Sequence, residues 1–249
     1  MAIIQTGRQL LVATLLLAGS LITAPAVQAA TLQISPVTIA LRATENAAGI
    51  TLSNPGDQAI HGQVRVFKWE QANGEDVLSP TQELVASPPL IEIPAQGEHL
   101  IRLVKTMQEP GNAERYYRVL IDEIPRSDDW AGSGVMIRMR YSVPVFVQPP
   151  GAPGSPALTW HLARQGTEWT LRVNNTGTGY GQISAVQLVD RTGRQHSVNR
   201  GLLGYALAGS AREWKMQLPQ GANWDQGVTI RANVNAIPVE AQVHPDSDT

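Results

Sequence analysis

Apolar and polar positions alternate over short runs along most of the chain, and turn-forming residues separate these runs. A period of two is typical of strands, because successive side chains point to opposite faces of a sheet. In the first half, residues 80–85 are expected to add no more than a helical turn. The expected strands there are 32–41, 48–53, 60–69, 90–93, 99–104, 116–124 and 135–147. Strands of this spacing predict an immunoglobulin-like β-sandwich.

The second half repeats this style, with turn signals such as Asn175-Thr176-Gly177 between its runs. The expected strands there are 157–163, 167–174, 181–190, 202–207, 211–217 and 229–235. Between the halves, residues 148–157 are rich in proline and glycine, which form neither helix nor ladder. We therefore predict an all-β protein with two β-sandwich domains, 30–148 and 157–245, a linker at 149–156 and a tail at 246–249, with fraying expected from His244 onward.

The N-terminus predicts export. Arg8 precedes an apolar run over 10–22, and Val27-Gln28-Ala29 follows as a small-x-small cleavage site. The run is about a dozen residues, short of the roughly 20 that a transmembrane helix needs. Residues 1–29 are therefore interpreted as a cleaved signal peptide, and no membrane insertion is expected. An uncleaved membrane anchor is the alternative.

Composition excludes several kinds of site. Without Arg8, 18 basic residues remain against 21 acidic ones, a net charge of −3 that predicts no nucleic-acid partner. The chain has no cysteine, so disulfides, thiolate metal sites and a cysteine nucleophile are excluded. Its 5 histidines show no metal-ligand spacing, and common catalytic motifs are missing. We expect no catalytic residue, no metal and no cofactor, and hence no enzyme.

The run 135–147 has the most informative pattern. Alternation places Val135, Ile137, Met139 and Tyr141 on one face of the expected strand. These side chains could fill the domain's own core. However, the strand is long, a loop rich in charge and glycine precedes it, and it is expected to end at Pro144, a residue confined to sheet edges and bulges. An edge strand offers unpaired backbone groups to a partner.

One family shares this pattern. The segment 116–125, with the sequence YYRVLIDEIP, is followed by a variable loop and an alternating strand. Supporting segments are LVASPP at 84–89, IPAQG at 93–97 and IRL at 101–103. Over the whole first domain, the chain resembles the periplasmic chaperones of the chaperone–usher pathway, which assemble pili.

The resemblance implies a boomerang of two sandwiches with a cleft between them, located in the periplasm. Such chaperones supply a strand to pilin subunits that lack their own last strand and deliver them to an outer-membrane usher, without a nucleotide. Strand addition of this kind combines backbone hydrogen bonds with pockets for alternate side chains, and the chaperone–pilin case is a known example. By position, the donor side chains are Val135, Ile137 and Met139, with Tyr141 as a fourth. Self-association of the free chaperone through its exposed strand stays open.

One part of the family pattern is missing. Better-known members bind the terminal carboxylate of the subunit with two basic residues, at positions where this chain has Pro36 and Pro144. The chain is therefore more similar to the divergent branches, called archaic or alternative. Arginine forms bidentate bonds with carboxylates, so Arg102 and Arg118 are the candidate anchors. The other interpretation is that each pairs with a local acid such as Glu123.

Two other classes of protein remain as hypotheses. A structural pilus subunit or adhesin would lack its final strand and carry an extra N-terminal extension. A carbohydrate-binding sandwich would expose aromatic rings for stacking. The tryptophans that could serve in this way are Trp130, Trp160, Trp169, Trp214 and Trp224. In sandwiches such residues more often lie in the core or at interfaces.

Overall fold

The computed structural model describes residues 32–106, 112–125, 138–166, 168–219, 224 and 227–245. Every regular element in these ranges is a β-strand, which confirms the predicted all-β class. None of the described residues belongs to a helix long and apolar enough to cross a membrane. The predicted signal peptide, 1–29, and the predicted tail, 246–249, lie outside the described residues.

The first domain is a sandwich of two sheets. One sheet has the order β1 (Gln33–Ser35), β3 (Ala47–Asn54), β8 (Gly97–Lys105) and β6 (Leu84–Ser87). The other has the order β2 (Ile39–Leu41), β10 (Arg140–Val147), β9 (Arg115–Ile124), β4 (Ile60–Ala72) and β5 (Glu75–Pro80), and β7 (Leu90–Ile93) also pairs with β4. The inward side chains of both sheets form one core. Its fully buried members include Ile50, Leu52, Ile101, Leu103, Tyr117, Val119 and Val145.

The strands of the first domain depart from the predictions at four places, one of which is β5, a strand that was not predicted. The run 32–41 divides at Pro36 into β1 and β2, which lie in different sheets, because proline lacks the N–H that would continue a ladder. Residues 84–87 form strand β6 instead of a helical turn. The expected end of a strand at Pro144 is also wrong, because β10 continues to Val147.

The second domain is a seven-stranded sheet that curves into a second sandwich. Its order is β14 (Gln195–Ala206), β13 (Gly181–Val189), β16 (Thr229–Val234), β17 (Ile237–Pro245), β11 (Leu158–Gln165), β12 (Glu168–Asn175) and β15 (Ser210–Met216). Strand β17 joins the two halves, since it pairs antiparallel with β16 and parallel with β11. This strand was not predicted, and it contains His244, so fraying from His244 was the wrong expectation.

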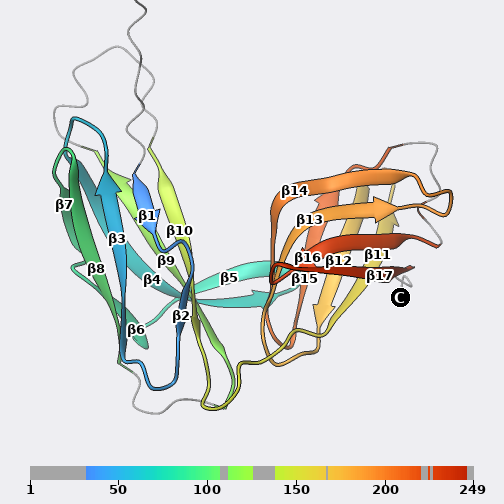
Figure 1. The fold of residues 1–249 in the computed structure, drawn as a ribbon, viewed down its shortest axis with the longest axis horizontal. Coiled ribbons are helices and arrows are strands. Elements are labelled where there is room, and N and C mark those ends of the chain that lie inside the picture. The colour runs from blue at the N-terminus through green and yellow to red at the C-terminus, as the bar shows by residue number, and fades with distance from the viewer. Residues whose placement is uncertain are drawn as a thin grey trace, which may run out of the picture.

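Figure 1 shows the two domains as the arms of a boomerang, with the linker passing below their junction. The β4–β5 hairpin extends from the first domain to the second. Its turn is Asn73-Gly74, with φ values of 53° and 75°. Positive φ at both positions is typical of the tight turns that Asn-Gly favours, which explains why the chain reverses here.

Candidate functional site

Strand β10 has one edge that is only partly covered. It pairs antiparallel with β9 along its whole length, from Arg140 opposite Asp122 to Val147 opposite Arg115. On its other edge, β2 pairs in parallel with Val145–Val147 alone. No other described strand pairs with residues 140–144 on that edge. Residues 140–144, which we call the open half, thus border a free sheet edge.

The ladder identifies which backbone groups of the open half are free. Glu123 donates its N–H to the carbonyl of Met139 at 3.2 Å, so odd-numbered residues of β10 bond with β9. On the other side, the N–H of Gln148 donates to the carbonyl of Leu41 at 2.8 Å, so even-numbered residues face β2. In an antiparallel ladder these directions alternate by residue. The free edge therefore presents the N–H and C=O of Arg140 and Ser142, whereas the parallel pairing of Val145 with Ile39 directs the C=O of Pro144 towards β2.

Two acids hold the first residues of the open half. Asp122 accepts hydrogen bonds from Arg65, at 2.7 Å, and from Arg140. On the opposite face of the sheet, Glu123 lies 3.4 Å from the hydroxyl of Tyr141. The adjacent acids thus point to opposite faces of the sheet, as successive residues of a strand do. Burial opposes ionisation of Asp122, but the bonds and charges of the two arginines outweigh it and lower its pKa below the ordinary value.

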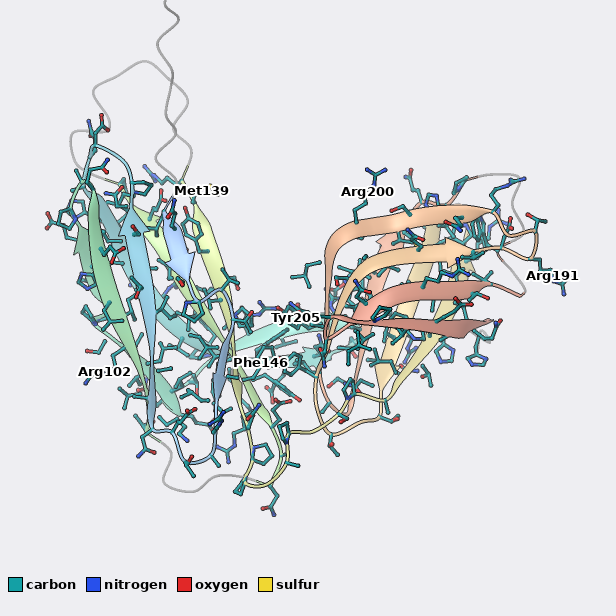
Figure 2. All side chains as sticks on the ribbon, viewed as in Figure 1. Arg102, Met139, Phe146, Arg191, Arg200 and Tyr205 are labelled. Carbon is teal, nitrogen blue, oxygen red and sulfur yellow. The ribbon has the colours of Figure 1, made fainter. Side chains whose placement is uncertain are left out.

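The predicted donor residues fall into three groups. Val135 and Ile137 lie outside the described residues. Met139 immediately precedes β10 and leaves 43% of its surface exposed, at the end of the strand furthest from the second domain (Figure 2). Tyr141, in contrast, packs against the core of its own domain. This side chain is therefore partly buried by its own domain, and its role as a fourth donor side chain stays a prediction.

Arg118 lies at the junction between the domains. Its guanidinium carbon lies 3.7 Å from the ring centre of Trp69 and 5.2 Å from that of Tyr205, which belongs to the second domain. The side chain is half-buried and forms no ion pair with a described carboxylate, so the expected pairing with an acid such as Glu123 is wrong for this arginine. Burial lowers the pKa of Arg118, while the charges of Tyr205 and Asp76 act in the opposite direction.

Pro144 is the direct cross-strand neighbour of Arg118 in the β9–β10 ladder. Neighbouring residues of two strands place their side chains on the same face of the sheet. The sequence comparison with the family marked Pro144 as the place of a missing basic residue. The structure shows that the adjacent strand brings a positive charge to that place.

Arg102 does not share this environment. It lies on β8, in the other sheet, and its side chain is exposed. Figure 2 shows it on the side of the first domain that faces away from the second domain. The structure therefore does not bring Arg102 and Arg118 together, because the two residues lie in different sheets of the sandwich, and the anchor role of Arg102 stays a prediction.

An aromatic cluster joins the domains beside Arg118. Phe146 stacks on Tyr180 with ring centres 3.6 Å apart, and Trp69 meets Tyr205 edge-on at 5.4 Å. Figure 2 shows Phe146 and Tyr205 close together at the junction. Tyr116 completes the cluster from β9. The sequence analysis missed the members from the second domain, because no local pattern links Tyr180 to Phe146, 34 residues earlier, or Tyr205 to Trp69, 136 residues earlier.

A cavity of about 500 Å³ also lies between the domains, but it does not include Arg118. Lys68, Glu70, Glu114 and Arg115 are among its lining residues, so its wall carries both charges. In the described part of the chain, no three His, Cys, Asp or Glu side chains converge as a metal site would require.

The tryptophans proposed for sugar stacking are mostly core residues. Trp160, Trp169 and Trp224 are buried in the second domain, and Trp214 packs against the same core. Trp130 lies outside the described residues. The first domain also contains its last strand, β10, paired within its own sheet, whereas a pilus subunit would lack that strand.

Comparisons with known proteins agree with this geometry. Residues 31–153 match the family model of the pili and flagellar-assembly chaperone, PapD N-terminal domain. A search of curated proteins found no match.

Similar solved structures cover both domains. One is a chain of the CsuC–CsuE chaperone–tip adhesion subunit pre-assembly complex from archaic chaperone–usher Csu pili of Acinetobacter baumannii. It has 25% identity and a TM-score of 0.66 over 87% of this chain and 99% of that one. The E. coli chaperone DraB shares the fold, with 20% identity and a TM-score of 0.57 over 86% and 97% of the two chains. By its matched N-terminal domain and its two-domain fold, the chain belongs to the pilus-assembly chaperones of the chaperone–usher pathway.

Proposed function

We propose that this chaperone captures pilin subunits by adding the open half of β10, together with the residues before it, to the incomplete sheet of the subunit. The observation that carries this proposal is the free edge of β10 at residues 140–144. The rest of this strand is paired on both edges. The chain in the similar structure comes from a chaperone–subunit complex, which supports a subunit as the partner here.

The side chains of Val135, Ile137 and Met139 are the proposed donors to the subunit's groove. Like Tyr141 and Val143, whose side chains point into the sandwich, these residues are odd-numbered. If the subunit-bound strand extends β10 towards residue 135, all of them lie on the same face of it. Burying each of them contributes about 1.5 to 3 kcal/mol before the cost of ordering the strand is subtracted.

The free edge also limits the strand that can bind there. Beyond Pro144, the edge is occupied by β2, which begins opposite Val145. Pro144 itself offers no N–H to continue the ladder. A partner strand along the open half must therefore end, or turn away, beside Pro144.

The charge at this point favours one kind of strand end. Arg118 lies next to Pro144 on the cleft face and has no described acid partner. A terminal carboxylate is attracted by this guanidinium, whereas a terminal amine is repelled. We infer that the subunit's terminal strand binds parallel to β10, with its carboxylate at Arg118. Arg118 is thus the single candidate anchor that we carry forward.

The remaining features of the proposed role follow from the family. We propose that the protein acts in the periplasm after removal of residues 1–29, that it delivers subunits to an outer-membrane usher, and that it performs no catalysis. Self-association through the free edge of the unliganded protein is a further expectation.

Co-purification tests the capture proposal. The mature protein is tagged and expressed in the periplasm of its host with the pilus genes active, beside an Ile137→Asp, Met139→Asp double variant. We expect a small β-rich pilin to bind the wild type and to be lost from the folded double variant. Full retention by the variant, or no pilin with the wild type, contradicts the proposal.

A further inference from the structure

The β4–β5 hairpin is a clasp between the domains. Its tip meets the edge strand β15, where the N–H of Glu213 donates to the carbonyl of Gly74 at 2.9 Å. The approach is so close that a Cβ on Gly74 would lie 2.7 Å from the carboxyl carbon of Glu213. The hairpin therefore contacts the second domain through its backbone and not only through flexible side chains.

Gln71, on β4, makes one set of contacts of the clasp with the second domain. Its amide nitrogen donates to the carbonyl of Tyr205 at 2.8 Å, and its amide oxygen accepts from the N–H of Leu207 at 2.9 Å. This side chain thus bonds to the backbone on both sides of Ala206, as a neighbouring strand would. It holds the end of β14 against the first domain.

Arg212, on β15, makes the other set of contacts, with the tip of the hairpin. Its side chain is 14% exposed and lies 2.9 Å from a carboxylate oxygen of Glu75 and 3.6 Å from one of Asp76. It also donates to the carbonyl of Gly74 at the hairpin tip. A single arginine of the second domain therefore contacts three consecutive residues of the first.

The clasp leads directly to the proposed carboxylate anchor. Tyr205, whose backbone Gln71 holds, places its ring centre 5.2 Å from the guanidinium carbon of Arg118. The ring of Trp69 lies 3.7 Å from the same carbon and 5.4 Å from the ring of Tyr205, so the two rings are neighbours. Together, the two rings exclude water from the part of the guanidinium that they cover. An ion pair is stronger where water is partly excluded, because charges at an exposed surface are screened.

We propose that Gln71 and Arg212 are positioning residues that hold Tyr205 over Arg118, so that the clasp determines how strongly the subunit's terminal carboxylate is bound. The inference rests on the proposed function. If the clasp opens, Tyr205 moves away with the second domain and Arg118 becomes hydrated. The strand-addition contacts of β10 belong to the first domain alone and are unaffected.

The test compares two forms of one ligand. A synthetic peptide carrying the terminal strand of the co-purified pilin is prepared as the free acid and as the C-terminal amide. With the wild type, we expect the acid to bind about tenfold more tightly than the amide. With Gln71→Ala and with Arg212→Ala, this ratio falls to about threefold or less, while binding of the amide changes little.

Matched controls are present in the second domain. Arg231 pairs with Glu240 at 2.8 Å, and Gln242 donates to Thr229 at 3.1 Å, both away from the junction. Arg231→Ala and Gln242→Ala should keep the full acid-to-amide ratio. A general loss of stability cannot mimic the expected result, because it weakens both forms of the peptide equally.

A distance measurement tests the clasp without any ligand. The chain has no cysteine, so spin labels can be attached through Glu98→Cys and Arg191→Cys, one exposed site in each domain. We expect the interdomain distance distribution to broaden in Gln71→Ala and Arg212→Ala and to stay unchanged in the controls.

Unchanged distances, or a full acid-to-amide ratio in both clasp variants, overturn the inference and leave subunit capture intact. Equal binding of acid and amide by the wild type overturns the anchor at Arg118 and this inference together. Failure of the wild type to bind either peptide overturns the proposed function as well.

Discussion

The two halves of strand β10 have the same neighbour on one side and different neighbours on the other. Both pair with β9, and both bury their odd-numbered side chains, such as Val143 and Val145, in the same core. On the far edge, Val145–Val147 pair with β2, whereas residues 140–144 pair with no described strand. One continuous strand is thus closed at one end and open at the other.

The path of the first strand explains this difference. Residues 33–35 pair with β3 in the four-stranded sheet, and the chain crosses to the other sheet after Pro36. The edge of β10 is therefore covered only where β2 has arrived. An open edge is a hazard for aggregation in most proteins. Here it is short, and the backbone groups it offers are those that a partner strand needs.

Proline substitutions at adjacent positions give the largest expected contrast between the two edges. The Val143→Pro substitution removes an N–H group that donates a hydrogen bond to β9. We therefore expect the free energy of unfolding to fall by about 3 kcal/mol or more. In Ser142→Pro, the lost N–H faces the free edge, where proline is tolerated, so the fold should be nearly as stable as the wild type. Subunit capture should weaken about tenfold or more, since a ladder bond is lost and the added strand is obstructed.

Denaturant unfolding and pilin affinity, measured on both variants, check this expectation. If Ser142→Pro is destabilised as strongly as Val143→Pro, it is incorrect that even-numbered residues of the open half face the free edge while odd-numbered residues bond to β9.

Val145→Ala tests the closed half. The side chain is fully buried between the sheets, so its truncation should cost about 2 kcal/mol of the free energy of unfolding. Because the closed half takes no part in capture, the affinity of the folded variant for pilin should equal that of the wild type. A clear loss of affinity in the native protein would show that the two halves are coupled.

Asp122→Asn tests how the open half is held. The pKa of Asp122 is lowered, so its ionised form contributes stability above the unfolded-state pKa of about 3.9, and this contribution is lost as the pH falls through the native pKa. We expect a small difference in stability between wild type and variant at neutral pH that disappears in acid. Unfolding midpoints over a pH series measure it, and a difference that persists at the lowest pH would contradict the role of the charge.

Glu114→Gln gives the smallest expected change in stability. At neutral pH this change is a gain, whereas Asp122→Asn is expected to cause a loss. Burial beside the closed half raises the pKa of Glu114, although Tyr116 and the N–H of Tyr180 donate hydrogen bonds to it. The ionised carboxylate therefore costs stability above its native pKa, and protonation relieves this cost as the pH falls. The variant should be slightly more stable than the wild type at neutral pH and equal to it in acid. A variant that is less stable at neutral pH would show that the hydrogen bonds outweigh burial.

Much of this molecule could be predicted from local patterns. Alternation located most strands, the proline-rich segment lies between the two sets of strands, and Asn73-Gly74 forms the kind of tight turn that this residue pair favours. These signals are local, because a strand and a tight turn depend on neighbouring residues. Strand β5 gave no such signal, since its mostly exposed residues pair at a sheet edge without an apolar face.

Only the tertiary structure distinguished Arg102 from Arg118. Both lie in alternating strands between apolar residues, and parity places both on an outer face. Parity does not specify what that face meets. The four-stranded sheet turns Arg102 towards solvent, whereas the six-stranded sheet turns Arg118 towards Trp69 and the second domain. The sequence by itself determined most of the strands and the family, because these depend on local order. The proposed anchor, the clasp and the free edge depend on which strands become neighbours.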